Sequence, residues 1–397
     1  MRKSAEACRA VSAPFATKIA ENDVVLPFSV AMSDQQKSTT SLQLLVENSR
    51  AALDALESKE TSLHDEGFPS TGFTTLRTDF ISLLALIYAA TTKVALSLKP
   101  SSPEHKASLT PLKNLSNNVA ALVHSIRLMR RNLAATILKE YEIVARNVIR
   151  EVLHFSEVLL SPPAASTSNE DYLVGVGKMH ELIDLARRSG GLSLNNREAV
   201  RKRWLQDRDS LVDGEEEIQE ICQSSDSDEP ADDDELFDDG WEELGISSKQ
   251  KLSPVERDRV EKVHSLIKIV VLLHKRVLKD VLEQDLNARN DSTLDNLATL
   301  SGRLLEASDD LISSMYGPQQ PSNIIAYLDA YSAVLKDVQK TLLLPRGRSL
   351  EDQVASLSLS MPSDEKSVKW FTTCFDQIEK ATAKISDILT DADRHES

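Results

Sequence analysis

Apolar residues recur every three or four positions along most of the chain, which is the period of an amphipathic α-helix. The first half contains such stripes over residues 42–56, 80–98, 112–159, 176–186 and 200–222. The third stripe is too long for one ordinary helix and slips by one position, so we place a turn near residues 130–132. The stripe over 80–98 is apolar nearly all round, which predicts a helix at the centre of a bundle.

Glycine and capping residues mark where the later helices of the first half end and begin. Gly190–Gly191 is typical of a helix C-cap. Asn195, followed by Glu198 three residues later, has the spacing of a capping box at the start of the next helix. We therefore expect residues 38–222 to close as one N-terminal bundle, preceded by a flexible leader over residues 1–37.

The second half repeats the helical period after a strong helix start. Ser253, Pro254 and Glu256 supply a hydroxyl N-cap, a proline at the first helical position and the carboxylate of a capping box. Apolar stripes follow over residues 260–278, 294–315, 324–342 and 371–389. Four long amphipathic helices with short or polar joins predict an antiparallel bundle over residues 253–397.

Composition favours an all-α chain. Of the 397 residues, 41% are hydrophobic but only 5% are aromatic and 12 are glycine, which favours helices packed through aliphatic side chains. The longest uncharged apolar run, residues 80–92, is shorter than the ~20 residues that a membrane span needs. The three cysteines lie far apart and form neither a disulfide framework nor a zinc motif. We expect an intracellular protein that does not enter a membrane.

The negative charge of the chain is concentrated in residues 213–243, which contain 16 Asp and Glu and no Lys or Arg. The whole chain has 62 Asp and Glu against 46 Lys and Arg, so these carboxylates account for the net charge of −16. Concentrated like charges repel one another and cannot form a buried core. The sequence therefore predicts a disordered acidic linker over residues 223–252, between the two antiparallel helical bundles.

Hydrophobic side chains interleave with the carboxylates of this linker, at Leu236, Phe237, Trp241 and Leu244. In a helix, Phe237, Trp241 and Leu244 share one face, which is the form of an acidic linear motif that docks in a groove of a partner protein. The alternative is that they attach the linker to the protein's own bundle. Ser225, with Asp228 three residues later, is a candidate phosphorylation site for an acidophilic kinase.

No pattern typical of an enzyme, a metal site or a cofactor site is present in the sequence, so none is predicted. Gly175–Lys178 resembles a phosphate loop only in part, because Met179 stands where Ser or Thr is needed and no strand precedes it. Calcium loops centred on Gly214 or Gly240 lack oxygen ligands at required positions. His274 lies on an apolar stripe and is interpreted as a core residue.

A basic cluster precedes the acidic stretch and consists of Arg187, Arg188, Arg197, Arg201, Lys202, Arg203 and Arg208. Nucleic acid binds to faces of this kind, but the acidic balance of the chain and the lack of interleaved aromatic residues argue against such a partner. The simpler hypothesis is that the cluster attracts the acidic stretch itself, through an interaction that salt would weaken.

Three stretches together resemble the cyclin-D-binding protein family, also called the GCIP family. They are Asn195–Val200 with the helix after it, the acidic join that ends in Asp238–Glu243, and Ala307–Pro318. In the last stretch a polar, Asp-containing helix leads into a turn similar to the family's Tyr-Pro-Pro turn, with Gly317 in place of the first proline. Their order and spacing cover most of the chain from about residue 38 onward.

The resemblance implies an all-helical, non-enzymatic regulator that binds D-type cyclins and helix-loop-helix proteins, occurs in the nucleus and the cytoplasm, and restrains cell-cycle progression. It implies no catalytic residue, cofactor or metal ligand. The alternative is a helical-bundle scaffold or adaptor of the cytoskeletal type, since up-and-down bundles recur in such proteins. A scaffold would bind its partner without the acidic linker, whereas a regulator that uses a linear motif would lose affinity on Trp241→Ala. The sequence leaves the oligomeric state open.

Overall fold

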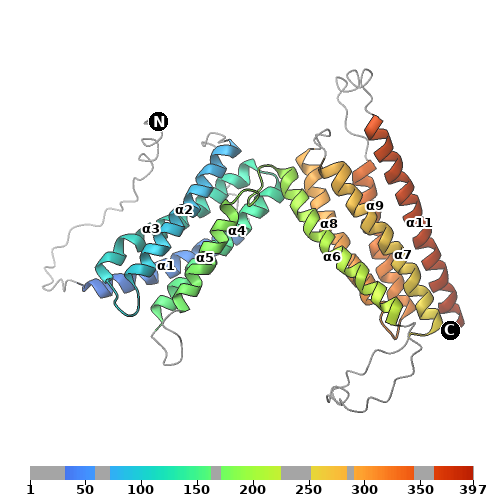
Figure 1. Cartoon of the computed structure of the whole chain (residues 1–397), viewed down its shortest axis with the longest axis horizontal. Coiled ribbons are helices and arrows are strands. Elements are labelled where there is room, and N and C mark those ends of the chain that lie inside the picture. Colours follow the sequence, from blue (N-terminus) through green and yellow to red (C-terminus); the bar gives the residue numbers. More distant parts are fainter. Residues whose placement is uncertain are drawn as a thin grey trace, which may run out of the picture.

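A computed structural model describes residues 32–58, 72–161, 171–224, 252–283, 290–343 and 362–396, and every regular element in these ranges is helical. The elements are α1 (Asp34–Glu57), α2 (Phe73–Ser97), α3 (His105–Asn132), α4 (Ala135–Leu160), α5 (Asp171–Arg187), α6 (Asn196–Ser224), α7 (Pro254–Val277) with its π-helical continuation η3 (Leu278–Leu282), α8 (Asp291–Ser313), α9 (Pro321–Leu343) and α11 (Pro362–Glu396). They form two bundles that meet at one end, where α6 begins (Figure 1). The predicted all-α fold with two antiparallel helical bundles is confirmed.

The first bundle is a closed ring of five helices, α1 to α5. Around the ring, α1 contacts α3, α3 contacts α2, α2 contacts α5, α5 contacts α4, and α4 returns to α1. Apolar side chains at helical spacing fill its centre, where the rings of Phe80 and Tyr141 meet edge to face with centroids 5.1 Å apart. The predicted break of the long stripe near residues 130–132 is confirmed, but it falls slightly later, since α3 continues to Asn132 and α4 begins at Ala135.

Helix α2 is one wall of this ring, so the prediction that it lies at the centre of the bundle is wrong. Its Phe80 and Ile87 are fully buried, but Leu86 and Leu96 on the opposite face are 52% and 73% exposed. By length and composition alone α2 would also suffice to cross a membrane, yet its buried face packs in the first core. An apolar pattern did not identify the outer face, because apolar atoms contribute much of any protein surface.

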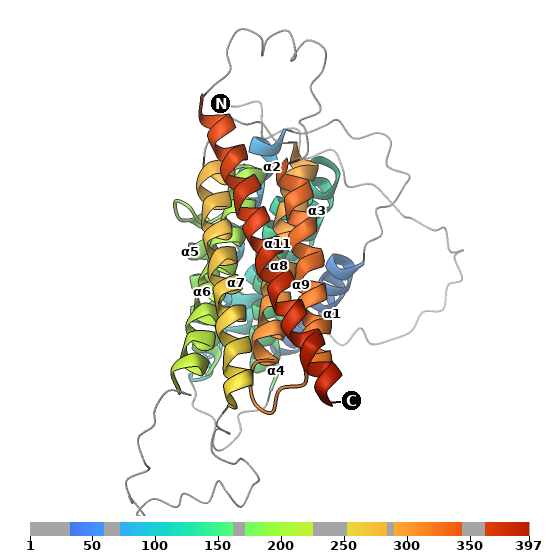
Figure 2. The same ribbon diagram turned by 90° about the vertical axis from the view of Figure 1, so that its right-hand side faces the viewer.

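The second bundle is also a ring of five helices: α6 contacts α8, α8 contacts α9, α9 contacts α11, α11 contacts α7, and α7 returns to α6. Figure 2 shows α7, α11 and α9 together on the outer side of this bundle. Helix α11 contributes a buried stripe that includes Phe371, Phe375 and Ile378. The predicted capping box that starts α7 is confirmed, since Ser253 Oγ accepts from the Glu256 N–H at 3.3 Å and the Glu256 carboxylate accepts from the Ser253 N–H at 2.8 Å.

Helix α6 packs in the second bundle, which corrects its predicted place in a bundle over residues 38–222. Val200, Trp204 and Ile218 lie in the second core, and only Ala199 in the first turn of α6 lies in the first. The four helices predicted for the second bundle were therefore one too few. The apolar period identifies the buried face of α6 but not the bundle which that face covers. Helix α1 also begins three residues before the predicted end of the leader.

Candidate functional site

The joint between the bundles is formed where residues of the second bundle cap the first turn of α4. The N-cap residue of α4 makes no side-chain hydrogen bond. Instead, the Asp295 carboxylate of α8 accepts from the N–H groups of Ala135 and Thr136, both at 2.9 Å, and from the Thr136 hydroxyl at 2.6 Å. Asn196 Oδ1 of α6 accepts from the Ile137 N–H at 3.1 Å. The free N–H groups of this helix start are thus satisfied across the joint.

Asp295 and Asn196 also bind each other, so that the joint connects α4, α6 and α8. Asn196 is buried, and its Nδ2 donates to Asp295 Oδ1 at 3.0 Å and to the carbonyl oxygen of Asp291 at 3.4 Å. Burial by itself raises the pKa of Asp295, but the hydrogen bonds from Thr136, Ala135 and Asn196 outweigh it and lower the pKa below its usual value. The ionised carboxylate also interacts favourably with the dipole of α4.

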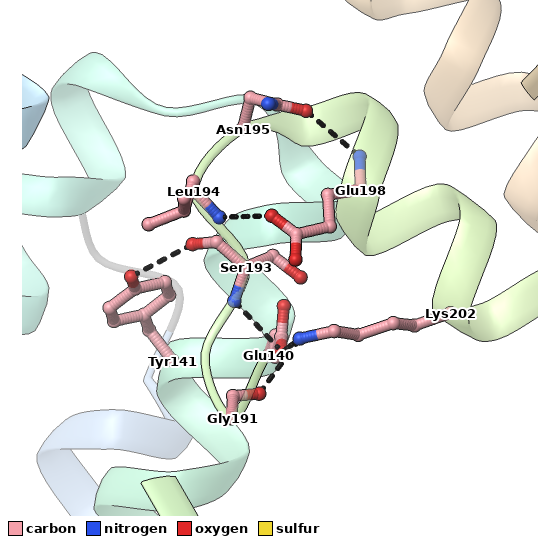
Figure 3. Close-up of polar contacts among 8 residues, drawn as sticks. All are labelled: Glu140, Tyr141, Gly191, Ser193, Leu194, Asn195, Glu198 and Lys202. Carbon is pink, nitrogen blue, oxygen red and sulfur yellow. Dashed lines mark hydrogen bonds and ion pairs between the residues drawn. The ribbon is translucent and has the colours of Figure 1, made fainter. Parts of the chain in front are cut away.

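The loop between α5 and α6 is attached to α4 beside this joint, as Figure 3 shows. The Tyr141 hydroxyl donates to the Ser193 carbonyl oxygen at 3.1 Å, and the Ser193 N–H donates to the Glu140 carboxylate at 3.2 Å. From α6, Lys202 Nζ donates to the same carboxylate at 3.0 Å and to the Gly191 carbonyl oxygen at 2.7 Å. Burial raises the pKa of Tyr141 to about 12, so its hydroxyl remains a donor at neutral pH.

The predicted caps in this loop are present. Asn195 Oδ1 accepts from the Glu198 N–H at 2.9 Å, while the Glu198 carboxylate accepts from the Leu194 N–H at 2.7 Å, one residue further back than in a standard capping box (Figure 3). Gly190 has φ +75°, a left-handed conformation that favours glycine. A Cβ on Gly191 would collide with carbonyl oxygens near the end of α5. These local constraints set the direction in which α6 leaves the first bundle.

His274 is a buried residue of the second core, as the sequence predicted. Its imidazole stacks on Trp204 with ring centroids 4.3 Å apart, and its Nε2 lies 3.1 Å from Ser301 Oγ. The Trp204 indole N–H donates to the His274 carbonyl oxygen at 2.9 Å. Burial, with a smaller effect from the Arg208 charge, lowers the pKa of His274 to about 3. The imidazole is therefore neutral at pH 7 and serves packing.

The candidate phosphate loop and His180 both lie in α5 of the first bundle. Gly175 and Gly177 lie within α5 and form no phosphate loop. His180 stacks on Tyr88 with ring centroids 3.6 Å apart, and its Nε2 lies 3.2 Å from Thr92 Oγ1. In the residues that the structure describes, no group of three or more His, Cys, Asp and Glu side chains is placed to hold a metal ion.

Most cations of the predicted basic cluster form ion pairs with carboxylates of the described residues. The ion pairs are Arg201–Glu283 at 3.3 Å, Lys202–Glu140 at 3.0 Å, Arg203–Asp207 at 3.1 Å, Arg208–Asp209 at 2.6 Å and Arg187–Asp184 at 3.9 Å. Arg197 donates to the carbonyl oxygen of Val281 at 3.0 Å. This pairing weakens the hypothesis that the cluster attracts the acidic stretch, since few of its charges are left for another partner.

The predicted partner-binding residues Leu236, Phe237, Trp241 and Leu244, and the candidate phosphorylation site Ser225, lie outside the described residues. They remain predictions. Sequence reasoning missed the joint residues Thr136, Asn196 and Asp295. A signal for them did exist, because α4 starts after Ala134 with no Ser, Thr, Asp or Asn at the N-cap. Such a helix start needs an acceptor from elsewhere in the fold.

Comparison with protein-family models gives two matches, in chain order. The model described as "Grap2 and cyclin-D-interacting, N-terminal" matches residues 79–224, and its C-terminal counterpart matches residues 237–340. The second match begins at Phe237 and so includes Trp241 and Leu244, whereas α1 and α11 lie outside both matches. No curated protein matches the chain. Since the two matches together span more than half of its residues, the chain belongs to the Grap2 and cyclin-D-interacting (GCIP) family, as the sequence resemblance predicted.

Proposed function

We propose that this protein is a non-enzymatic interaction regulator that binds a D-type cyclin or a helix-loop-helix protein and thereby modulates cell-cycle progression. The observation that supports the proposal is the pair of family matches, whose description is cyclin-D-interacting. The all-helical, two-bundle architecture agrees with a protein that works by presenting surfaces to partners. The same proposal places it in the cytoplasm and the nucleus.

The proposed contact is the hydrophobic part of the acidic stretch, Leu236, Phe237, Trp241 and Leu244. The second family match begins within this part, at Phe237. In a helix, Phe237, Trp241 and Leu244 form one apolar edge among carboxylates, suited to a hydrophobic groove with a basic rim. Buried aromatic anchors supply much of the binding energy in contacts of this size.

The proposal is tested with purified proteins. Binding of a D-type cyclin, and separately of a helix-loop-helix protein, to the intact chain is measured by surface plasmon resonance. We expect the double substitution Phe237→Ala and Trp241→Ala to weaken the affinity at least ~10-fold, because each lost anchor is worth ~1–2 kcal/mol. The control, Leu86→Ala with Leu96→Ala, removes two exposed apolar side chains from α2 and should leave the affinity unchanged.

Two other results of this binding experiment would lead to different conclusions. If neither protein binds to the intact chain, the proposed function is refuted. If one binds and the aromatic substitutions have no effect, the contact lies on the bundles. That second result would favour the scaffold alternative, in which the acidic stretch serves only as a spacer.

A further inference from the structure

The outer face of α7 and α11 carries exposed lysines that have no ion-pair partner among the described residues. They are Lys275 on α7, Lys279 on its continuation η3, and Lys366, Lys369, Lys380 and Lys384 on α11. The two helices contact each other and lie side by side on this side of the bundle (Figure 2). We call these six lysines, together with the apolar residues Ile269, Leu272 and Trp370 between them, the α7/α11 face.

The positive charge of this face is local, because over their whole lengths α7, η3 and α11 together contain 12 Lys and Arg and 12 Asp and Glu. In their facing parts, residues 262–280 of α7 and η3 and residues 366–384 of α11, they contain nine Lys and Arg but only three Asp and Glu. Of the nine, Lys262 pairs with Asp258, Lys268 lies 3.7 Å from Glu215, and Arg276 lies 2.6 Å from Asp280. The remaining six are the lysines named above. The basic cluster of α6 is different, because most of its cations are paired.

A hydrophobic strip runs between these cations. Leu272 is 58% exposed, and Ile269 and Trp370 are half-buried against the second core. The guanidinium of Arg276 lies 5.4 Å from the centre of the Trp370 ring, a cation–π contact that joins the two helices. The face therefore offers positive charge and apolar surface together, which is what an acidic segment with hydrophobic anchors requires.

The opposite charge gathers at the end of the second bundle where α6 stops. Glu217 accepts a hydrogen bond from the Tyr316 hydroxyl at 2.8 Å, and Glu220, Asp309 and Asp310 lie near it. Burial, together with the charges of Glu217 and Asp310, raises the pKa of Asp309 above its usual value. An acidic segment that continues from α6 is repelled at this end and attracted along the α7/α11 face.

The chain between α6 and α7 is long enough to reach this face. Trp241 precedes Leu252 by 11 residues, which span up to ~37 Å when extended. Leu272 follows Leu252 by 20 residues, or ~30 Å along a helix. On the other side, the 13 residues from Ser224 to Phe237 span up to ~45 Å. Both its charge and the length of the chain on either side therefore make the acidic segment suited to bind the α7/α11 face.

We propose that the α7/α11 face binds the chain's own acidic segment, residues 226–244, with carboxylates beside the six lysines and with Phe237 and Trp241 on the apolar strip of Ile269, Leu272 and Trp370. This intramolecular contact covers the aromatic side chains and must be displaced before they reach another protein. The inference goes beyond the proposed function and does not depend on which partner the protein has.

The first test is zero-length carboxylate–amine cross-linking of the intact, dilute protein, mapped by mass spectrometry. We expect cross-links within one chain from the carboxylates of residues 226–243 to Lys275, Lys279, Lys366 and Lys369, in amounts that fall as ionic strength rises. Cross-links made equally to Lys93, Lys106 and other first-bundle lysines, or made only between two chains, would overturn the proposal.

The second test measures how fast a Glu-specific protease cleaves within residues 226–243 of the full chain. Neutralising four lysines of the face, Lys275, Lys279, Lys366 and Lys369, by substitution with Gln should raise the rate at least ~5-fold, because the segment is released. The matched control neutralises four exposed lysines of the first bundle, Lys93, Lys106, Lys113 and Lys178, and should leave the rate unchanged. Equal rates in both variants, with circular dichroism unchanged, contradict the inference even if cyclin binding is found.

Discussion

The two bundles share one plan, a ring of five helices, but differ in the chemistry that each ring contains. The first core is mainly aliphatic, with Phe80 and Tyr141 as an aromatic pair. The second core contains the neutral His274 stacked on Trp204. The surface of this bundle carries an acidic end and the six lysines of the α7/α11 face, which have no ion-pair partner in the part of the chain that the structure describes. Packing therefore dominates the first bundle, whereas the second also has groups that respond to pH, salt and a charged partner.

Truncation of Trp204 should give the largest loss of stability, and this loss should be confined to the second bundle. Trp204→Ala removes a fully buried indole, its stack on His274 and its hydrogen bond, so we expect a loss of ~3–5 kcal/mol in the free energy of unfolding. Hydrogen exchange should show lost protection in α6 to α11 and little change in α1 to α5, with Phe80→Ala as the first-bundle counterpart. Lost protection mainly in α1 to α5 would contradict the assignment of α6 to the second ring.

Removing the Asp295 carboxylate should weaken the joint between the rings without unfolding either one. Asp295→Ala leaves the Ala135 and Thr136 N–H groups without their acceptor, at a cost of ~2–3 kcal/mol. Hydrogen exchange at residues 135–137 should accelerate, and small-angle scattering should show a wider range of molecular dimensions. Glu306→Ala, which removes an exposed carboxylate farther along α8, is the control. Unchanged exchange at 135–137 would show that Asp295 does not cap α4.

The direction of the pKa shift of Asp295 determines how the cap that it forms on α4 depends on pH. The pKa of Asp295 is lowered in the folded protein, so its contribution is complete above the unfolded value near ~4 and is lost as pH falls through the lower, folded pKa. The joint should therefore be insensitive to pH in the neutral range. An Asp295-dependent loosening between pH 7 and 6 would contradict the assigned protonation state.

Mild acid should destabilise the second bundle through His274. Its pKa falls from 6.5 to about 3 on folding, so below pH 6.5 only the unfolded state takes up the proton. Stability then falls by up to ~1.4 kcal/mol per pH unit, or ~2 kcal/mol between pH 6.5 and 5. Urea unfolding followed by tryptophan fluorescence measures it, because the described tryptophans, Trp204 and Trp370, lie in this bundle.

Two substitutions isolate this effect. His274→Gln should flatten the acid slope of the second bundle, and an unchanged slope would show that His274 is not its source. His180 of the first bundle also has a lowered pKa, again through burial, so His180→Gln is the matched change there. It should leave the tryptophan-detected slope as it is in the intact protein.

The smallest losses of stability are expected from the two capping boxes, one at the start of α1 in the first bundle and one at the start of α7 in the second. Ser33 accepts from the Gln36 N–H at 3.2 Å on α1, and Ser253 accepts from the Glu256 N–H at 3.3 Å on α7. Ser33→Ala and Ser253→Ala should each cost ~1 kcal/mol. Hydrogen exchange should find each loss in its own bundle, and an equal loss in both bundles from either change would show that the rings unfold as one unit.

The starts and ends of the helices were predicted well from the sequence, because they depend on residues that are neighbours in the chain. The capping box at Ser253, the glycine pair at 190–191 and the helix break near residue 132 all follow from chemistry within a few positions of the chain. The apolar stripes likewise predicted the buried face of the helices other than α2, which is apolar on both faces. The family resemblance, which rested on the order of three weak motifs, is confirmed by two matches.

Long-range choices were not predictable by the same means. The stripe through Val200 and Trp204 has the same period whether it covers the first or the second ring, so α6 was assigned to the helices beside it in sequence. Asp295 is separated from Thr136 by 159 positions, and only the folded arrangement brings them together. The basic cluster is mostly paired, whereas the lysines of the α7/α11 face have no ion-pair partner among the described residues. This difference likewise depends on neighbours that the sequence does not specify.

The most direct test of the account compares the affinity of a D-type cyclin for the intact chain with its affinity for three variants. These are the aromatic variant (Phe237→Ala with Trp241→Ala), the four-lysine variant of the α7/α11 face and the four-lysine control of the first bundle. The account predicts weaker binding for the first, tighter binding for the second because the acidic segment is released, and no change for the third. No binding of the cyclin by either the intact chain or the four-lysine variant of the α7/α11 face would refute the cyclin part of the proposed function. Unchanged or weaker binding by the second variant would show that the α7/α11 face does not compete for the segment.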